Sequence, residues 1–131
     1  LTRMREARAE TPALAFFHIP IRAYQSLHRP GVTPGVALEG VCFEEEDGSA
    51  LAALQTGGRL RACFCGHDHV NDYAVRAGSL ALVYGRATGH SGYGGEKLRK
   101  GAKVIDVALD TGATTWTTVF ADGTRETLPA P

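Results

Sequence analysis

The sequence has no hydrophobic run close to the roughly 20 residues that a membrane-spanning helix requires, so we expect no membrane partner. It has no excess charge of either sign, because 14 lysine and arginine residues balance 14 aspartate and glutamate residues. A neutral chain lacks the positive field that attracts phosphate backbones, which argues against a nucleic-acid partner. Cysteine is scarce, and the odd number of thiols (Cys42, Cys63 and Cys65) argues against a disulfide framework.

The sequence does contain enough apolar material for one folded unit. Its 131 residues are 44% hydrophobic and 21% charged, a composition typical of a globular protein with a core. Most domains have roughly 50 to 200 residues. We therefore predict that residues 1–131 form a single module.

The first half of the chain alternates between helix and strand patterns. Apolar residues at helical spacing predict the end of an amphipathic helix over residues 2–10, and a short helix is expected over residues 49–54. Residues 13–17 and 60–65 are continuous apolar runs of the kind that form buried strands. A strand, a crossover with a helix and a second strand make a βαβ unit, so these strands should be parallel. Residues 22–46 show no clear periodicity and predict a long irregular excursion.

The second half has the composition of an antiparallel sheet. Residues 79–84, 103–109 and 115–120 predict strands, and the turn signal Asp110-Thr111-Gly112 joins the last two as a hairpin. Five of the eleven residues in 85–95 are glycine, so this glycine loop can approach a neighbouring group closely. Together with the βαβ unit, these patterns predict an α/β fold.

Three histidines follow the two predicted buried strands. His18 lies just after the first strand, and His67 and His69 lie just after the second. The carboxyl ends of parallel strands meet at one edge of a sheet, where ligand sites gather. Imidazole is the most common metal ligand among side chains. This placement predicts a histidine rim (His18, His67 and His69) that binds metal.

Two segments carry a resemblance to a known family. They are Ala13-Leu14-Ala15-Phe16-Phe17-His18-Ile19-Pro20 and Gly66-His67-Asp68-His69-Val70-Asn71-Asp72-Tyr73. They resemble the last two metal-ligand motifs of calcineurin-like metallophosphoesterases, in the purple-acid-phosphatase-like branch. Residues 84–94 and 99–105 are similar to segments that follow these motifs in that branch. The resemblance implies the C-terminal half of a two-sheet β-sandwich flanked by helices.

The resemblance also implies a reaction and roles for individual residues. Such enzymes hydrolyse phosphate esters with two metal ions about 3.5 to 4 Å apart, which activate a hydroxide for in-line attack on phosphorus. His18 and His67 would bind one ion and His69 the other, and the ions would be divalent or mixed-valence iron, zinc, manganese or magnesium. Further candidates for orienting these ligands or contacting the substrate are Asp68, Asn71, Asp72, Arg86, His90 and Tyr93.

The sequence departs from the family in its other motifs. Family members take their remaining ligands, and the histidine that protonates the leaving group, from D-x-H, G-D-x-x-D and G-N-H motifs in the N-terminal half, and this sequence has no counterpart of these at the family's positions. We therefore expect the C-terminal part of a longer phosphoesterase, which needs its N-terminal half as a partner. By itself the chain should bind one metal ion or none and be inactive.

Two other interpretations remain open at this point. In the first, the three histidines hold one zinc in a noncatalytic module that binds a protein partner. In the second, the chain is a scaffold that binds nothing. In either case strands that would pair with a missing half present open edges, which predicts homo-oligomers.

Overall fold

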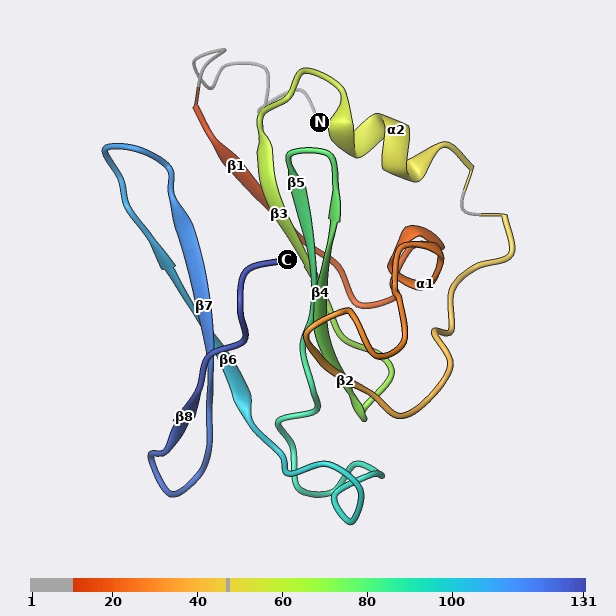
Figure 1. The fold of residues 1–131 in the computed structure, drawn as a ribbon, viewed down its shortest axis with the longest axis vertical. Coiled ribbons are helices and arrows are strands. Elements are labelled where there is room, and N and C mark those ends of the chain that lie inside the picture. The colour runs from red at the N-terminus through yellow and green to blue at the C-terminus, as the bar shows by residue number, and fades with distance from the viewer. Residues whose placement is uncertain (1–10, 47) are drawn as a thin grey trace.

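The computed structural model describes residues 11–46 and 48–131, which form two β-sheets and two short helices (Figure 1). The helix predicted over residues 2–10 lies outside the described residues. Figure 1 shows the larger sheet in the middle, the smaller sheet on the left and both helices on the right. The predicted α/β class with a two-sheet arrangement flanked by helices is therefore confirmed.

The larger sheet contains the predicted βαβ unit. Its five strands have the order β1-β3-β5-β4-β2. Their bounds are Ala13–Phe16 (β1), Gly35–Ala37 (β2), Leu60–Cys65 (β3), Asn71–Ala77 (β4) and Leu80–Tyr84 (β5). β1 and β3 are parallel neighbours, as predicted, and β5 is parallel to β3 on its other side.

Two strands of this sheet were not predicted. β4 pairs with β5 as an antiparallel hairpin, and it begins with the polar residues Asn71 and Asp72, both fully buried. β2 is only three residues long, lies within the predicted irregular excursion and pairs with β4. The same excursion contains helix α1 (Ala23–Ser26), so its description as wholly irregular was wrong.

The smaller sheet contains two of the three strands predicted for the antiparallel end of the chain. The third, at residues 79–84, corresponds to β5, and its expected place in that end was wrong because it pairs with β3 and β4 in the larger sheet. The strands of the smaller sheet, β6 (Ala102–Val107), β7 (Thr114–Val119) and β8 (Arg125–Glu126), lie in sequence order. β6 and β7 pair as a hairpin across the predicted turn. Ile105 and Trp116 from this sheet pack against a buried cluster on the larger sheet that includes Ala62, Phe64 and Val83. The two sheets thus share one layer of the core.

The helices cover the opposite face of the larger sheet. Helix α2 (Ala50–Gln55) matches the predicted helix, and its Leu51 and Leu54 pack against the second core cluster. That cluster contains Tyr24 from α1 and the strand residues Leu82 and Tyr84. Cys63 and Cys65 are buried in it as free thiols.

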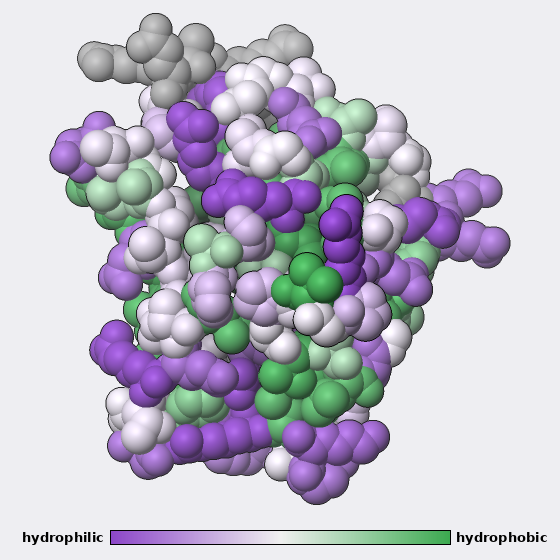
Figure 2. Space-filling view, viewed as in Figure 1, coloured by the Kyte–Doolittle hydropathy of each residue, from purple (hydrophilic) through white to green (hydrophobic). Residues whose placement is uncertain are grey.

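The exposed surface mixes polar and apolar residues. On the face drawn in Figure 2, hydrophobic residues form separate areas among hydrophilic ones. Helices α1 and α2 have four and six residues, and no helix in the described part of the chain is long and apolar enough to cross a membrane.

Candidate metal centre

The histidine rim lies at the carboxyl ends of two adjacent parallel strands. His18 is two residues beyond the end of β1 and His67 is two residues beyond the end of β3. The amide of Gly66 donates a hydrogen bond of 3.2 Å to the carbonyl of His18, which fixes the two strand ends relative to each other. The backbone pairing of β1 with β3 therefore brings together two residues 49 positions apart.

The side chains of His18 and His67 face each other at ligand spacing. His18 Nε2 lies 3.1 Å from His67 Nδ1, and the two rings are nearly perpendicular. Two imidazole nitrogens bound to one zinc ion at about 2.0 to 2.1 Å lie roughly 3 to 3.4 Å apart, so the observed spacing fits a shared ion. His67 has a φ of 78°, and this left-handed conformation of a residue with a side chain is typical of a functional position.

His69 is held by residues from two other segments. Its ring stacks on the ring of Tyr93 at 4.1 Å, and its Nδ1 lies 3.3 Å from the carbonyl oxygen of Tyr93. A bond from Nδ1–H to that carbonyl leaves Nε2 unprotonated, which is the state that a metal ligand requires. The Tyr93 hydroxyl accepts a bond from the His69 amide and donates to the carboxylate of Glu39. Partial desolvation and the Glu39 carboxylate raise the pKa of Tyr93, so this hydroxyl stays a donor.

The three histidines line one hollow of about 330 Å³. Residues Gly85 to Gly89 and Gly92 complete its wall, so the glycine loop lies against the histidine rim. A Cβ atom at Gly92 would lie 2.8 Å from Cε1 of His69, so the loop reaches this position only with glycine there. The loop therefore approaches a residue of the histidine rim closely, in accordance with its composition.

Asp68 and Asn71 anchor the excursion to the rim. Oδ2 of Asp68 accepts hydrogen bonds from the amide of Cys42 and from the hydroxyl of Tyr84. Asn71 accepts from the amides of Leu38 and Glu39 and donates to the carbonyl of Glu39. Burial and the bond to Asp68 raise the pKa of Tyr84 far above its usual value. The side chains of Asp68 and Asn71 thus hold the backbone of Leu38, Glu39 and Cys42 next to the histidines.

Asp72 and Arg86 pair with each other inside the protein. The Arg86 guanidinium donates to Asp72 at 2.5 Å and to Glu126 at 2.7 Å, although Arg86 also borders the hollow. Asp72 additionally binds Lys103 and accepts a bond from Thr118. These groups connect β4 with the smaller sheet, so the contacts of Asp72 and Arg86 are those of residues that join the two sheets.

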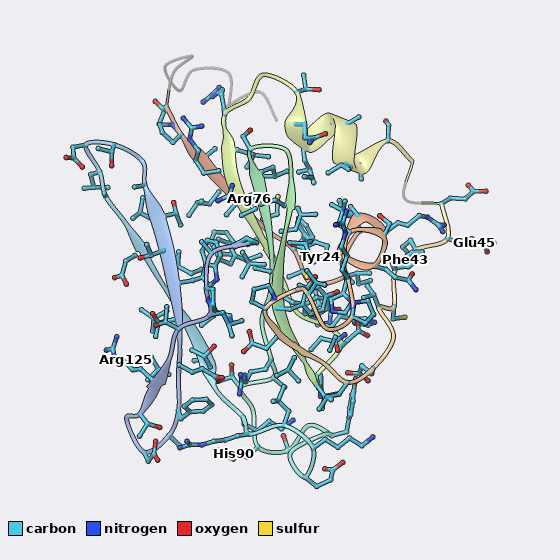
Figure 3. All side chains as sticks on the ribbon, viewed as in Figure 1. Tyr24, Phe43, Glu45, Arg76, His90 and Arg125 are labelled. Carbon is cyan, nitrogen blue, oxygen red and sulfur yellow. The ribbon has the colours of Figure 1, made fainter. Side chains whose placement is uncertain are left out.

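His90 lies farther out on the glycine loop. It is exposed and lies outside the residues that border the hollow, and Figure 3 labels it on that loop. Sequence reasoning missed Glu39 and Cys42, which the excursion brings beside the rim. No local pattern marks either residue, because both reach the rim through contacts with residues more than 20 positions away.

We expect the substitution Gly92→Ala to displace the His69 ring. The added methyl group would overlap the imidazole, and overpacking of this kind lowers the free energy of unfolding by about 1 to 3 kcal/mol. Histidine side-chain NMR would detect the change as a shifted His69 resonance, with His28 as an internal reference. Gly89→Ala is the matched control, since a Cβ there meets nothing within 4 Å. An unmoved His69 resonance in the Gly92 variant would contradict this view of the loop.

Comparison with curated proteins finds relatives in Arabidopsis thaliana. One, named "Probable inactive purple acid phosphatase 28", is 37% identical over 106 residues, which are 80% of this chain and 26% of that protein. A second, "Probable inactive purple acid phosphatase 29", is 34% identical over 99 residues, which are 76% of this chain and 25% of that protein. The chain spans about a quarter of the length of these relatives. No protein-family model and no solved structure matches it.

Proposed function

We propose that this chain, which belongs to the purple acid phosphatase branch of the calcineurin-like metallophosphoesterase superfamily, supplies the histidine ligands of a metal centre. His18 and His67 would hold one ion, and His69 would be a ligand of a second. In a complete domain the two ions would polarise the phosphoryl oxygens of a phosphate ester and activate water for attack on phosphorus.

The 3.1 Å separation of His18 Nε2 and His67 Nδ1 is the observation that carries this proposal. Two imidazoles beyond the ends of neighbouring strands, held by a backbone hydrogen bond between Gly66 and His18, offer their nitrogens to one point. Tyr93 and Glu39 orient His69, and Gly92 leaves room for its ring. The protein's own contribution is thus a pre-ordered set of nitrogen ligands beside a hollow open to solvent.

The chain alone supplies three imidazoles and lacks the remaining ligand motifs of the family. A two-metal hydrolase needs further carboxylate ligands to bridge and hold both ions. We therefore expect the separate chain to bind an ion without hydrolysing phosphate esters. The word "inactive" in the names of the relatives favours a second candidate, a noncatalytic module that binds metal through the same histidines.

The test is Mn²⁺ binding to the full chain, measured by electron paramagnetic resonance. We expect His18→Ala and His67→Ala each to weaken binding by at least about tenfold, because each removes one of two nitrogens on the same ion. His28→Ala is the matched control: it removes an imidazole that contacts the Tyr73 ring, and it should leave Mn²⁺ affinity unchanged.

Hydrolysis of p-nitrophenyl phosphate by the same preparation should stay at the level of buffer. Substantial metal-dependent hydrolysis would contradict the expectation that further ligands are required. Equal Mn²⁺ affinity in the wild-type chain and in His18→Ala would overturn the assignment of His18 and His67 to one ion.

A further inference from the structure

His67 has a second group of donor atoms beside it. One ligand atom from each of Cys42, His67 and Asp68 lies within 4.8 Å of the other two. Ions such as zinc bind sulfur at about 2.3 Å and nitrogen or oxygen at about 2.0 to 2.2 Å, so small side-chain rotations would bring these three atoms to one ion. His18 does not belong to this group.

Cys42 is held in place by the backbone. Its amide donates a hydrogen bond of 3.0 Å to Oδ2 of Asp68, and this bond holds the cysteine backbone next to the carboxylate. The next residues of the loop are fixed to helix α1, because Arg22 stacks over the Phe43 ring and donates to the carbonyl of Glu45. Figure 3 labels Phe43 and Glu45 on this segment beside α1.

His67 and Asp68 border the hollow beside the rim, although Asp68 itself is buried. Cys42 is exposed, whereas Cys63 and Cys65 are buried in the core. Both hydrogen bonds to Asp68 end on Oδ2, which leaves lone pairs on Oδ1. A thiolate, an imidazole and a carboxylate form a mixed donor set, and the thiolate selects soft ions over magnesium or manganese.

We infer that Cys42, His67 and Asp68 form a separate site for a thiophilic divalent cation such as Zn²⁺ or Cd²⁺. The ion replaces the thiol proton of Cys42, which passes to the buffer. This site goes beyond the proposed function, because it requires neither His18 nor His69. The two sites share His67 and therefore compete for it.

The test is a titration of the full chain with Cd²⁺ in a reducing buffer, followed by the ultraviolet band of thiolate-to-metal charge transfer. The wild-type chain should develop this band at about one equivalent. Cys42→Ser should abolish the band and weaken Cd²⁺ binding by at least about tenfold, since the soft ligand is lost. Cys63→Ala is the matched thiol control and should keep the band.

Two outcomes would overturn the site. The first is a wild-type chain without the band, and the second is a band that persists in Cys42→Ser. His18→Ala distinguishes this site from the proposed centre, because it should keep the Cd²⁺ band while it weakens Mn²⁺ binding. Loss of the band in His18→Ala would overturn the assignment of a separate site, and circular dichroism checks that each variant folds.

Discussion

Replacing Asp72 with asparagine should lower the free energy of unfolding by about 3 to 5 kcal/mol. The Asp72 side chain is fully buried and faces two cations, Arg86 and Lys103, whose side chains are 4% and 11% exposed. Asparagine keeps the shape of the residue and removes its charge. Arg86 would then keep one carboxylate partner, Glu126, while Lys103 would lose the carboxylate it faces, and the cost of an uncompensated buried charge is large.

The expected loss of stability is large because the charges of this buried cluster balance in the wild-type chain. Two carboxylates (Asp72 and Glu126) balance two cations (Arg86 and Lys103), and Thr118 donates a further bond of 3.1 Å to Asp72. The members come from both sheets, so the loss also weakens the contact between the sheets. Urea unfolding followed by circular dichroism measures the change.

Two controls make this prediction specific. Asp122→Asn applies the same chemical change to an exposed carboxylate paired with Arg99, and it should leave stability almost unchanged. Adding Lys103→Met to Asp72→Asn should recover part of the loss, because it restores charge balance. A loss below about 1 kcal/mol in Asp72→Asn would show that the cluster contributes little.

A second large effect is expected at high pH. The core contains five buried ionisable side chains that are neutral when protonated, and desolvation raises the pKa of each. They are Tyr24, Tyr73, Tyr84, Cys63 and Cys65. For Cys63 the rise is from 9.0 to about 11. Above pH 9 the unfolded chain releases protons that the folded chain retains.

The direction of the effect follows from this difference. Stability is complete below the unfolded pKa values and falls as pH rises, by up to about 1.4 kcal/mol per pH unit for each group. The free energy of unfolding should therefore decrease steeply between pH 9 and pH 11, as measured by urea unfolding at several pH values. A flat profile over this range would contradict the burial of these groups.

The contribution of one thiol to this pH dependence can be tested by removing it. Cys63→Ala should make the slope between pH 9 and pH 11 shallower by up to about 1.4 kcal/mol per pH unit, because one of the five groups is gone. Val75→Ala truncates the same core cluster without removing an ionisable group. It should lower stability at every pH and leave the slope unchanged.

The strands that carry the histidine rim could be predicted from the sequence. The two apolar runs at residues 13–17 and 60–65 correspond to β1 and β3, and a crossover that contains a helix makes them parallel. Parallel pairing alone places His18 near His67. A continuous apolar run is a strong local signal for a strand, and for this reason the two strands were predicted correctly. The expectation that the first of them is buried on both faces was wrong, because β1 lies at the edge of the sheet and its Phe16 is exposed.

The missed parts depend on long-range contacts. β4 begins with Asn71 and Asp72, which resemble loop residues until partners from the segment after β2 and from β6 and β7 bind them. Tyr93 was a candidate for orienting a ligand or contacting the substrate, and the structure places its ring on His69. No sequence pattern marked Glu39 and Cys42, because their proximity to the histidine rim depends on contacts with residues distant in the sequence.

The wide sequence separation of the rim also has a consequence for the order of folding. β4 and β5 are joined by a tight turn, so this hairpin closes a short loop and can form on the microsecond timescale. His18 and His67 meet only after 49 positions of chain have been brought together, and that closure costs more conformational entropy. The topology thus predicts that the hairpin forms early and that the histidine pair is assembled late, on a template already in place.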